Sequence, residues 1–185
     1  ITGADISFTA PLSFDVTIPA GPVSVADMFK LYRFENMLYK IELTGKEIDK
    51  YLEFSCSEWF NTMSGPADYL LKYRLDKDGK PLITGGKAWL KNPSYSFDSA
   101  NGIDYIVDVS KPEGEQVKIS SFSDGRIFEP DKKYSVAVNS HRGSGGGRHL
   151  TEGVGLTPKE LSDRLISSTD RDLRYYMLNY IEKQN

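Results

Sequence analysis

The segment that most restricts the fold of this chain is a junction between a strand pattern and a capped helix, at residues 36–60. Residues 36–43 read NMLYKIEL, in which apolar and polar side chains alternate as they do in a half-buried strand. Thr44 and Glu47 follow with the spacing of a capping box, which predicts that a helix begins directly after the strand. Apolar residues then recur at helical spacing, so the predicted helix runs from about Lys46 to Phe60.

The same alternation of strand and helix patterns continues along the chain without a low-complexity linker. Three more strands are predicted at residues 103–110, 116–122 and 133–140, with a tight turn at Asp124-Gly125. Two helices are predicted to close the sequence. One begins at Thr157, which Pro158 and Glu160 follow, and the other begins at Asp172. The predicted fold is α+β, with residues 1–185 forming one domain of mixed or antiparallel strands and three or four helices.

The overall composition excludes several classes of protein. The chain has 185 residues with 39% hydrophobic content, enough for one well-buried domain. Its net charge of -3 lacks the basic footprint of a protein that binds polymeric nucleic acid, and no apolar run reaches the length of a membrane helix. Cys56 is the single cysteine, which excludes an internal disulfide and a cysteine-rich zinc site. The first residues contain no signal peptide and run directly into a strand pattern, so we expect the chain to be a piece of a longer polypeptide.

A glycine-rich segment, NSHRGSGGGRH at residues 139–149, contains both histidines of the chain. It lacks the Lys and Ser/Thr of a phosphate-binding P-loop, and its glycines do not have the spacing of a dinucleotide-binding fingerprint. With only His141 and His149, the sequence cannot supply the ligands of a two-metal centre. No Ser lies in a nucleophile elbow either. The segment is therefore interpreted either as a loop that lets backbone approach a flat ligand or as a flexible surface turn.

Four stretches, in this order along the chain, carry a resemblance to a known family. They are APL near Pro11 with IPAG at residues 18–21, then ADMFKLYRFEN with ELTGKEIDKYLE, then YSFDSANGIDYIVDVSKP, and finally YSVAVNSHRGSGGG. Together they resemble the C-terminal domain of the 5'-nucleotidase family, and most closely the bacterial 2',3'-cyclic-nucleotide 2'-phosphodiesterase/3'-nucleotidases. The resemblance runs from about Asp5 to Gly147, with a looser similarity in the last helix.

This resemblance implies a division of labour between domains. In the family, the C-terminal domain binds the nucleoside, and an N-terminal metallophosphoesterase domain carries two divalent metals and the catalytic residues. We therefore expect this chain to hold no catalytic residue and no cofactor, and to work with a metallophosphoesterase domain that is N-terminal or separately encoded. The expected ligand is a nucleotide or nucleoside. The resemblance also implies an exported protein, periplasmic or at the cell surface.

The resemblance further implies which residues bind the ligand. The family holds the base between two aromatic side chains, whose positions here are Phe34 and His141, and the amide of Asn36 contacts the base. The remaining predicted ligand-binding residues come from the glycine-rich segment: Asn139, Arg142, Gly145 and Gly146.

Three departures from the family pattern leave an alternative function open. The first loop contains no Arg before Arg33, although the family uses an Arg there to hold phosphate. His141 replaces Phe or Tyr, giving a smaller stacking surface whose charge depends on pH. Gly147 stands where 5'-nucleotidases have an Asp for the ribose hydroxyls, which argues against that specificity. The rival hypothesis is a non-catalytic binding module that keeps the fold; a complete stand-alone hydrolase is the least favoured reading.

Overall fold

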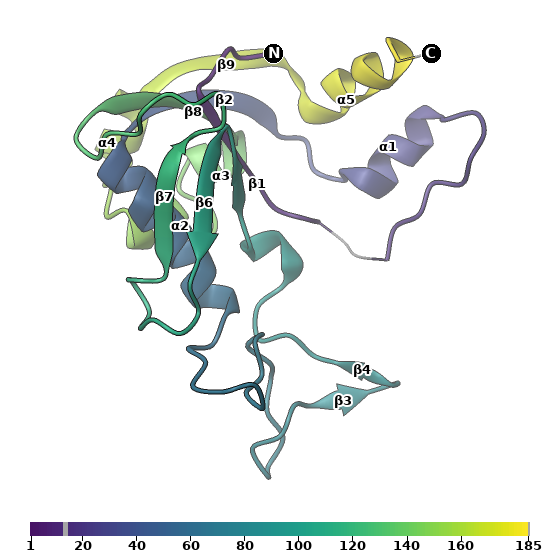
Figure 1. Ribbon diagram of the computed structural model, residues 1–185. Coiled ribbons are helices and arrows are strands. Elements are labelled where there is room, and N and C mark those ends of the chain that lie inside the picture. Colours follow the sequence, from purple (N-terminus) through teal and green to yellow (C-terminus); the bar gives the residue numbers. More distant parts are fainter. Residues whose placement is uncertain (13–14, 185) are drawn as a thin grey trace.

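The centre of the molecule is a five-stranded sheet in the order β5-β1-β8-β2-β9 (Figure 1). The computed structural model describes residues 1–12 and 15–184, so two residues of the first loop, Ser13 and Phe14, lie outside the described part. Strand β1 runs parallel to β8, and the other neighbouring strands are antiparallel. The predicted mixed sheet is therefore confirmed. Its strands are β1 (Ile6–Thr9), β2 (Met37–Thr44), β5 (Ser99–Asn101), β8 (Lys133–Asn139) and β9 (Leu165–Asp172).

Helices surround this sheet. In the described part of the chain, four α-helices have six or more residues: α1 (Val25–Leu31), α2 (Gly45–Trp59), α4 (Pro158–Asp163) and α5 (Leu173–Glu182). Shorter helical turns are η1 (Ser94–Ser96), α3 (Ser140–Gly143) and the π-helical η2 (His149–Gly153). The predicted α+β class is confirmed, and each of the two helices expected near the C-terminus is present.

The strand-to-helix junction forms as the sequence predicts. The Thr44 Oγ1 accepts a hydrogen bond from the Glu47 backbone N–H at 3.3 Å, and the Thr44 backbone N–H donates to Glu47 Oε2 at 2.7 Å. Helix α2 therefore begins at a complete capping box. Its apolar face packs on the sheet in the main core, whose members include Ile41, Leu43, Ile48, Tyr51, Leu52, Phe122, Val136 and Val138.

Two antiparallel hairpins lie outside the central sheet. Strands β6 (Ile103–Val107) and β7 (Val117–Phe122) form the first, at the positions predicted from the sequence, and β7 contacts α2. Strands β3 (Ile83–Thr84) and β4 (Lys87–Ala88) form the second, on an arm of residues 61–92 that extends away from the sheet (Figure 1). The sequence analysis did not anticipate this arm.

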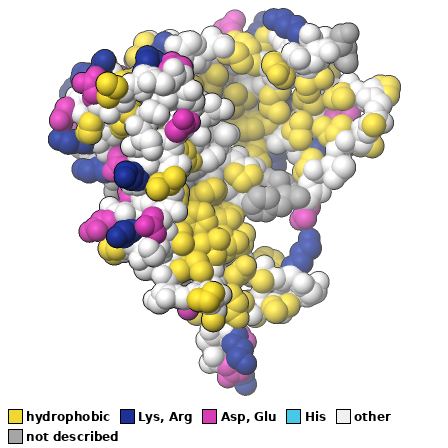
Figure 2. All heavy atoms as spheres, viewed as in Figure 1, with side chains coloured by type: hydrophobic (Ala, Val, Ile, Leu, Met, Phe, Trp, Pro, Cys, Tyr) yellow, Lys and Arg dark blue, Asp and Glu magenta, His cyan; other side chains and the backbone are white. Residues whose placement is uncertain are grey.

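The edge strand β9 is the main element that the sequence analysis missed. It lies between α4 and α5 and pairs with β2 through two irregularities in register. After β9, the chain places α5 beside α1, where the Arg174 guanidinium lies 4.2 Å from the centroid of the Phe29 ring. Figure 2 shows hydrophobic side chains gathered over this part of the molecule, where Val25, Phe29 and Tyr180 are exposed.

Candidate functional site

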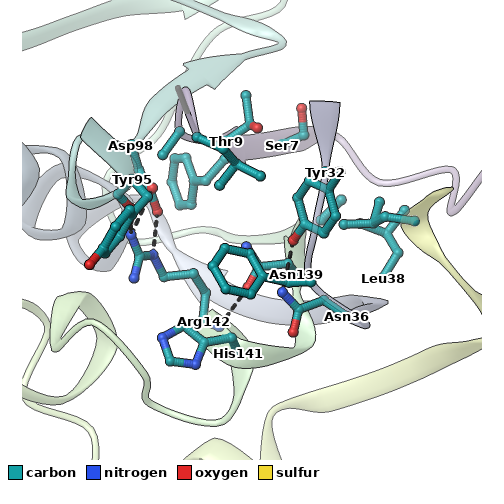
Figure 3. A pocket seen from close by; sticks show the side chains of 16 residues that line it. Ser7, Thr9, Tyr32, Asn36, Leu38, Tyr95, Asp98, Asn139, His141 and Arg142 are labelled. Carbon is teal, nitrogen blue, oxygen red and sulfur yellow. Dashed lines mark hydrogen bonds and ion pairs between the residues drawn. The ribbon is translucent and has the colours of Figure 1, made fainter. Parts of the chain in front are cut away.

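A cavity of about 450 Å³ lies between strands β1 and β8 and the segment that connects α1 to β2 (Figure 3). Apolar side chains from β1 and β2 form part of its wall, among them Phe8 and Leu38. Five of the seven residues predicted to bind a ligand line this cavity: Phe34, Asn36, Asn139, His141 and Arg142. Gly145 and Gly146 do not belong to the described lining.

The segment that carries Phe34 and Asn36 is fixed by the N-terminus of α5. The Leu173 backbone N–H donates to the Asn36 carbonyl at 2.9 Å, and Arg174 Nη1 donates to the Arg33 carbonyl at 3.2 Å. Phe34 remains 39% exposed, and the guanidinium of Arg33 lies 5.2 Å from its ring centroid. The last helix thus holds the aromatic side chain at the mouth of the cavity rather than in the core.

His141 is positioned by the end of strand β8. Asn139 is the N-cap of α3, and its side-chain Oδ1 accepts the backbone N–H of Arg142 at 2.8 Å. His141 is exposed on this short helix, and its ring lies against the backbone of Gly146, where any Cβ would overlap it. The glycine therefore provides room for the His141 ring, a role that differs from the predicted approach to a ligand.

The hydroxyl of Ser140 bridges the two segments that carry Phe34 and His141. The Met37 backbone N–H donates to Ser140 Oγ at 3.2 Å, and Ser140 Oγ is 3.4 Å from Asn36 Oδ1. Because Ser140 directly precedes His141, these contacts fix the distance between the two segments that carry the predicted aromatic pair.

Arg142 is held mainly by the protein itself. It is 5% exposed, and its Nε and Nη2 donate to the Asp98 carboxylate at 2.8 and 3.1 Å. Nη2 also donates to the Tyr95 carbonyl at 2.6 Å, and Nη1 donates to the Gly146 carbonyl at 3.3 Å. Four of the five guanidinium N–H groups therefore have protein acceptors. This arrangement ties the glycine-rich loop to Asp98.

Both residues of this ion pair are buried, and further side chains pack around them. The Tyr51 hydroxyl donates to Asp98 Oδ2, and burial together with the charge of Asp98 raises the pKa of Tyr51 well above its ordinary value. Burial alone would lower the pKa of Arg142, but the hydrogen bonds and charge of Asp98 outweigh it and raise that pKa. Nearby, burial lowers the pKa of His149, which packs against the ring of Tyr51. The raised pKa of Arg142 keeps its guanidinium charged beside Asp98.

Several residues of the site have no signal in the sequence. Tyr32, Tyr95 and Asp98 line the cavity, and Arg174 fixes one wall from the far end of the chain. The Phe-Asp pair that contains Asp98 was part of the family resemblance, but nothing in its spacing predicts the contact with Arg142, 44 residues away.

In residues 1–12 and 15–184, no group of three or more His, Cys, Asp or Glu side chains could hold a metal ion. The family resemblance assigns its two metals to the metallophosphoesterase domain and not to these side chains.

Comparison with known proteins agrees with the fold. The profile of the family described as "5'-nucleotidase, C-terminal domain" matches residues 1–152. The chain belongs to this family. Its fold is also similar to the 5'-nucleotidase precursor of Thermus thermophilus, with a TM-score of 0.55 at 21% identity over 90% of this chain and 30% of that one.

Two curated relatives of this 5'-nucleotidase C-terminal domain are much longer proteins. The trifunctional nucleotide phosphoesterase protein YfkN of Bacillus subtilis (strain 168) is 27% identical over 93% of this chain, which spans 11% of that protein. A 2',3'-cyclic-nucleotide 2'-phosphodiesterase/3'-nucleotidase of Salmonella typhimurium is 28% identical over 74% of this chain, which spans 20% of that protein. The chain thus corresponds to a small part of each relative. None of the described helices is long and apolar enough to cross a membrane.

Proposed function

We propose that this chain is the nucleotide-recognition domain of a bacterial phosphoesterase that hydrolyses 2',3'-cyclic nucleotides or nucleoside monophosphates. The observation that carries the proposal is the meeting of Phe34, Asn36 and His141 at one cavity, although they come from two distant segments of the chain. The names of the Bacillus and Salmonella relatives support this substrate class.

In this proposal the ligand is held mainly through its base. Phe34 and His141 flank the base, and the amide of Asn36 contacts its edge. Stacking of a base on an aromatic side chain contributes about 1–3 kcal/mol. Arg142 acts indirectly, because its bonds to Asp98 and Gly146 hold the loop under His141.

Bond cleavage is assigned to a part of the protein outside this chain. A metallophosphoesterase domain, N-terminal in the same polypeptide or separately encoded, would supply two divalent metals and the catalytic groups. The share of the relatives that this chain spans, 11% and 20%, leaves ample room for such a domain in those proteins. An exported location, periplasmic or at the cell surface, is part of the same proposal.

A second candidate function is a binding module that keeps the fold and has no catalytic partner. One specific observation favours it: Arg142 is the only Lys or Arg in the described lining of the cavity, and Asp98 compensates its charge. A phosphate would therefore find no unpaired cation in this wall. The two candidates differ in whether a catalytic domain acts with this chain, and loss of the nucleoside site would favour the second.

The test is calorimetric titration of the purified chain with adenosine, 3'-AMP and 2',3'-cyclic AMP. We expect saturable binding that a Phe34→Ala variant weakens by about 5- to 150-fold, the range that corresponds to one lost stacking contact. Tyr180→Ala is the matched control, because Tyr180 is 65% exposed and outside the described lining of the cavity. Adenosine and 3'-AMP are expected to bind with similar affinity, since the wall offers no free cation.

Two results would count against the proposal. Equal binding by wild type and Phe34→Ala would remove Phe34 from the site. A lack of saturable binding by any of the three ligands at millimolar concentration would favour the binding module that has lost its nucleoside site.

A further inference from the structure

Tyr32 is a polar residue of the cavity to which the family resemblance assigns no role. It is the C-cap of α1, where its backbone N–H donates to the Met28 carbonyl at 2.7 Å. Its side chain is half-buried, and Figure 3 shows its hydroxyl directed at the amide of Asn36, on the opposite side of the cavity from Asp98. Tyr32 and Asn36 thus form one polar end of the cavity, separated from the ion pair of Asp98 and Arg142.

The hydroxyl oxygen of Tyr32 accepts a hydrogen bond from a neighbouring amide. Asn36 Nδ2 donates to it at 2.8 Å. Burial raises the pKa of Tyr32, and the hydrogen bond from the Asn36 amide acts in the opposite direction. The orientation of the Asn139 amide is fixed independently, because its Oδ1 accepts the Arg142 N–H as a helix cap. Its NH₂ group therefore remains a hydrogen-bond donor in the lining of the cavity.

This geometry determines where the Tyr32 proton can go. A phenol has one donor proton and two acceptor lone pairs. The Asn36 amide occupies one acceptor position, and burial raises the pKa of the phenol, which favours its protonated form. In residues 1–12 and 15–184, the hydroxyl proton has no protein acceptor, so it is available to a molecule in the cavity.

The side-chain amides of Asn36 and Asn139 also present hydrogen-bond donors to the cavity. Each NH₂ has two protons; one proton of Asn36 is directed at Tyr32, which leaves the second N–H of Asn36 and the NH₂ of Asn139 as further donors in the lining. Their oxygens are engaged elsewhere, Asn36 Oδ1 near Ser140 and Asn139 Oδ1 at the start of α3. This end of the cavity is therefore a wall of hydrogen-bond donors.

We propose that Tyr32 is a specificity-determining residue that donates its hydroxyl proton to an acceptor on the edge of the bound base. A wall of donors favours bases that present a ring carbonyl oxygen, as in inosine and uridine. It disfavours bases that present an exocyclic amino group, as in adenosine and cytidine. This inference rests on the proposed nucleoside site and adds to it the chemical class of base.

The test compares inosine with adenosine by calorimetric titration of wild type and Tyr32→Phe. Wild type is expected to bind inosine more tightly than adenosine. Tyr32→Phe keeps the ring and loses the donor, so inosine affinity should fall about 2- to 12-fold. The ratio of inosine affinity to adenosine affinity should therefore decrease. Tyr180→Phe is the control, because it removes a hydroxyl at an exposed position away from the cavity. Its affinities for inosine and adenosine should equal those of wild type. Thermal melts of both variants check that the fold is kept.

The outcomes separate this inference from the proposed function. Nucleoside binding by wild type that Tyr32→Phe leaves unchanged, or a wild-type preference for adenosine, overturns the role of Tyr32 and leaves the nucleoside site intact. Absence of binding by wild type to every nucleoside overturns both. Weaker inosine binding by Tyr32→Phe, with an unchanged thermal melt and unchanged Tyr180→Phe binding, supports the donor role.

Discussion

The buried ion pair of Asp98 and Arg142 gives the sharpest test of how this site is held together. The perturbation is Asp98→Ala. The wild-type carboxylate accepts hydrogen bonds from Tyr51 and from two nitrogens of Arg142, and its side chain is 3% exposed. Removing it leaves a guanidinium that is also buried, without its counter-charge.

The expected magnitude follows from this burial. Removing one partner of a buried ion pair costs about 3–5 kcal/mol, because the remaining charge is left uncompensated. For a domain of this length, each kcal/mol shifts the melting temperature by about 2–4 °C, so the variant should melt about 6–20 °C lower. Tyr51→Phe removes one hydrogen bond to the same carboxylate and should cost less, about 1.5–3 kcal/mol.

The assay is urea denaturation followed by fluorescence, combined with a double-mutant cycle. Arg142→Met and the double variant Asp98→Ala/Arg142→Met complete the cycle. The double variant should be more stable than the sum of the single losses predicts, because it contains no stranded charge. A loss below about 1 kcal/mol for Asp98→Ala, or strictly additive losses in the cycle, would refute the reasoning.

Three further predictions follow from the described geometry. Gly147→Ala should destabilise the fold by more than about 1 kcal/mol in the same urea assay, because Gly147 has a φ of +74° and its Cβ would overlap the Arg142 guanidinium; equal stability would contradict this packing. His149→Phe should flatten the acid limb of stability against pH. Burial lowers the pKa of His149 below its ordinary 6.5, so the neutral ring stabilises the fold above pH 6.5 and that contribution is lost as the pH falls towards the folded-state pKa; identical pH profiles of the two proteins would count against it. Thr44→Ala should cost about 0.5–2 kcal/mol through loss of the cap to the Glu47 N–H, measured as a lower urea midpoint, with no change expected in nucleoside affinity.

Local signals explain which elements the sequence predicts well. The start of α2 was predictable because the strand alternation, Thr44 and Glu47 all lie within a few residues of one another. Strand β9 was missed for the opposite reason. It reads LISSTDRD, its apolar Leu165 and Ile166 are exposed, and its polar residues suit a sheet edge. Its pairing with β2 comes from tertiary contacts that no local pattern encodes.

The residues of the candidate site likewise fall into those that the sequence located and those that only the structure shows. The family resemblance located Phe34, Asn36 and His141, and the structure places all three at one cavity. It could not indicate that Arg142 would be buried against Asp98, because this contact depends on how the loop after η1 meets helix α3. Nor could it indicate that Arg174, on the last helix, would hold the Arg33 carbonyl. Long-range polar contacts of this kind have no periodicity that a sequence could display.

The charge distribution of the cavity links the missing loop Arg to the proposed division of labour. A phosphate needs a cation or a set of free N–H donors, and the guanidinium of Arg142 is already compensated by Asp98. The free donors that remain, on Tyr32, Asn36 and Asn139, are uncharged and lie at the end where a flat ring edge can reach them. A wall of this kind can select a base while contributing little to the binding of a phosphate. If the chain serves a phosphoesterase, the charge that holds the phosphate must therefore come from the partner domain that also supplies the metals.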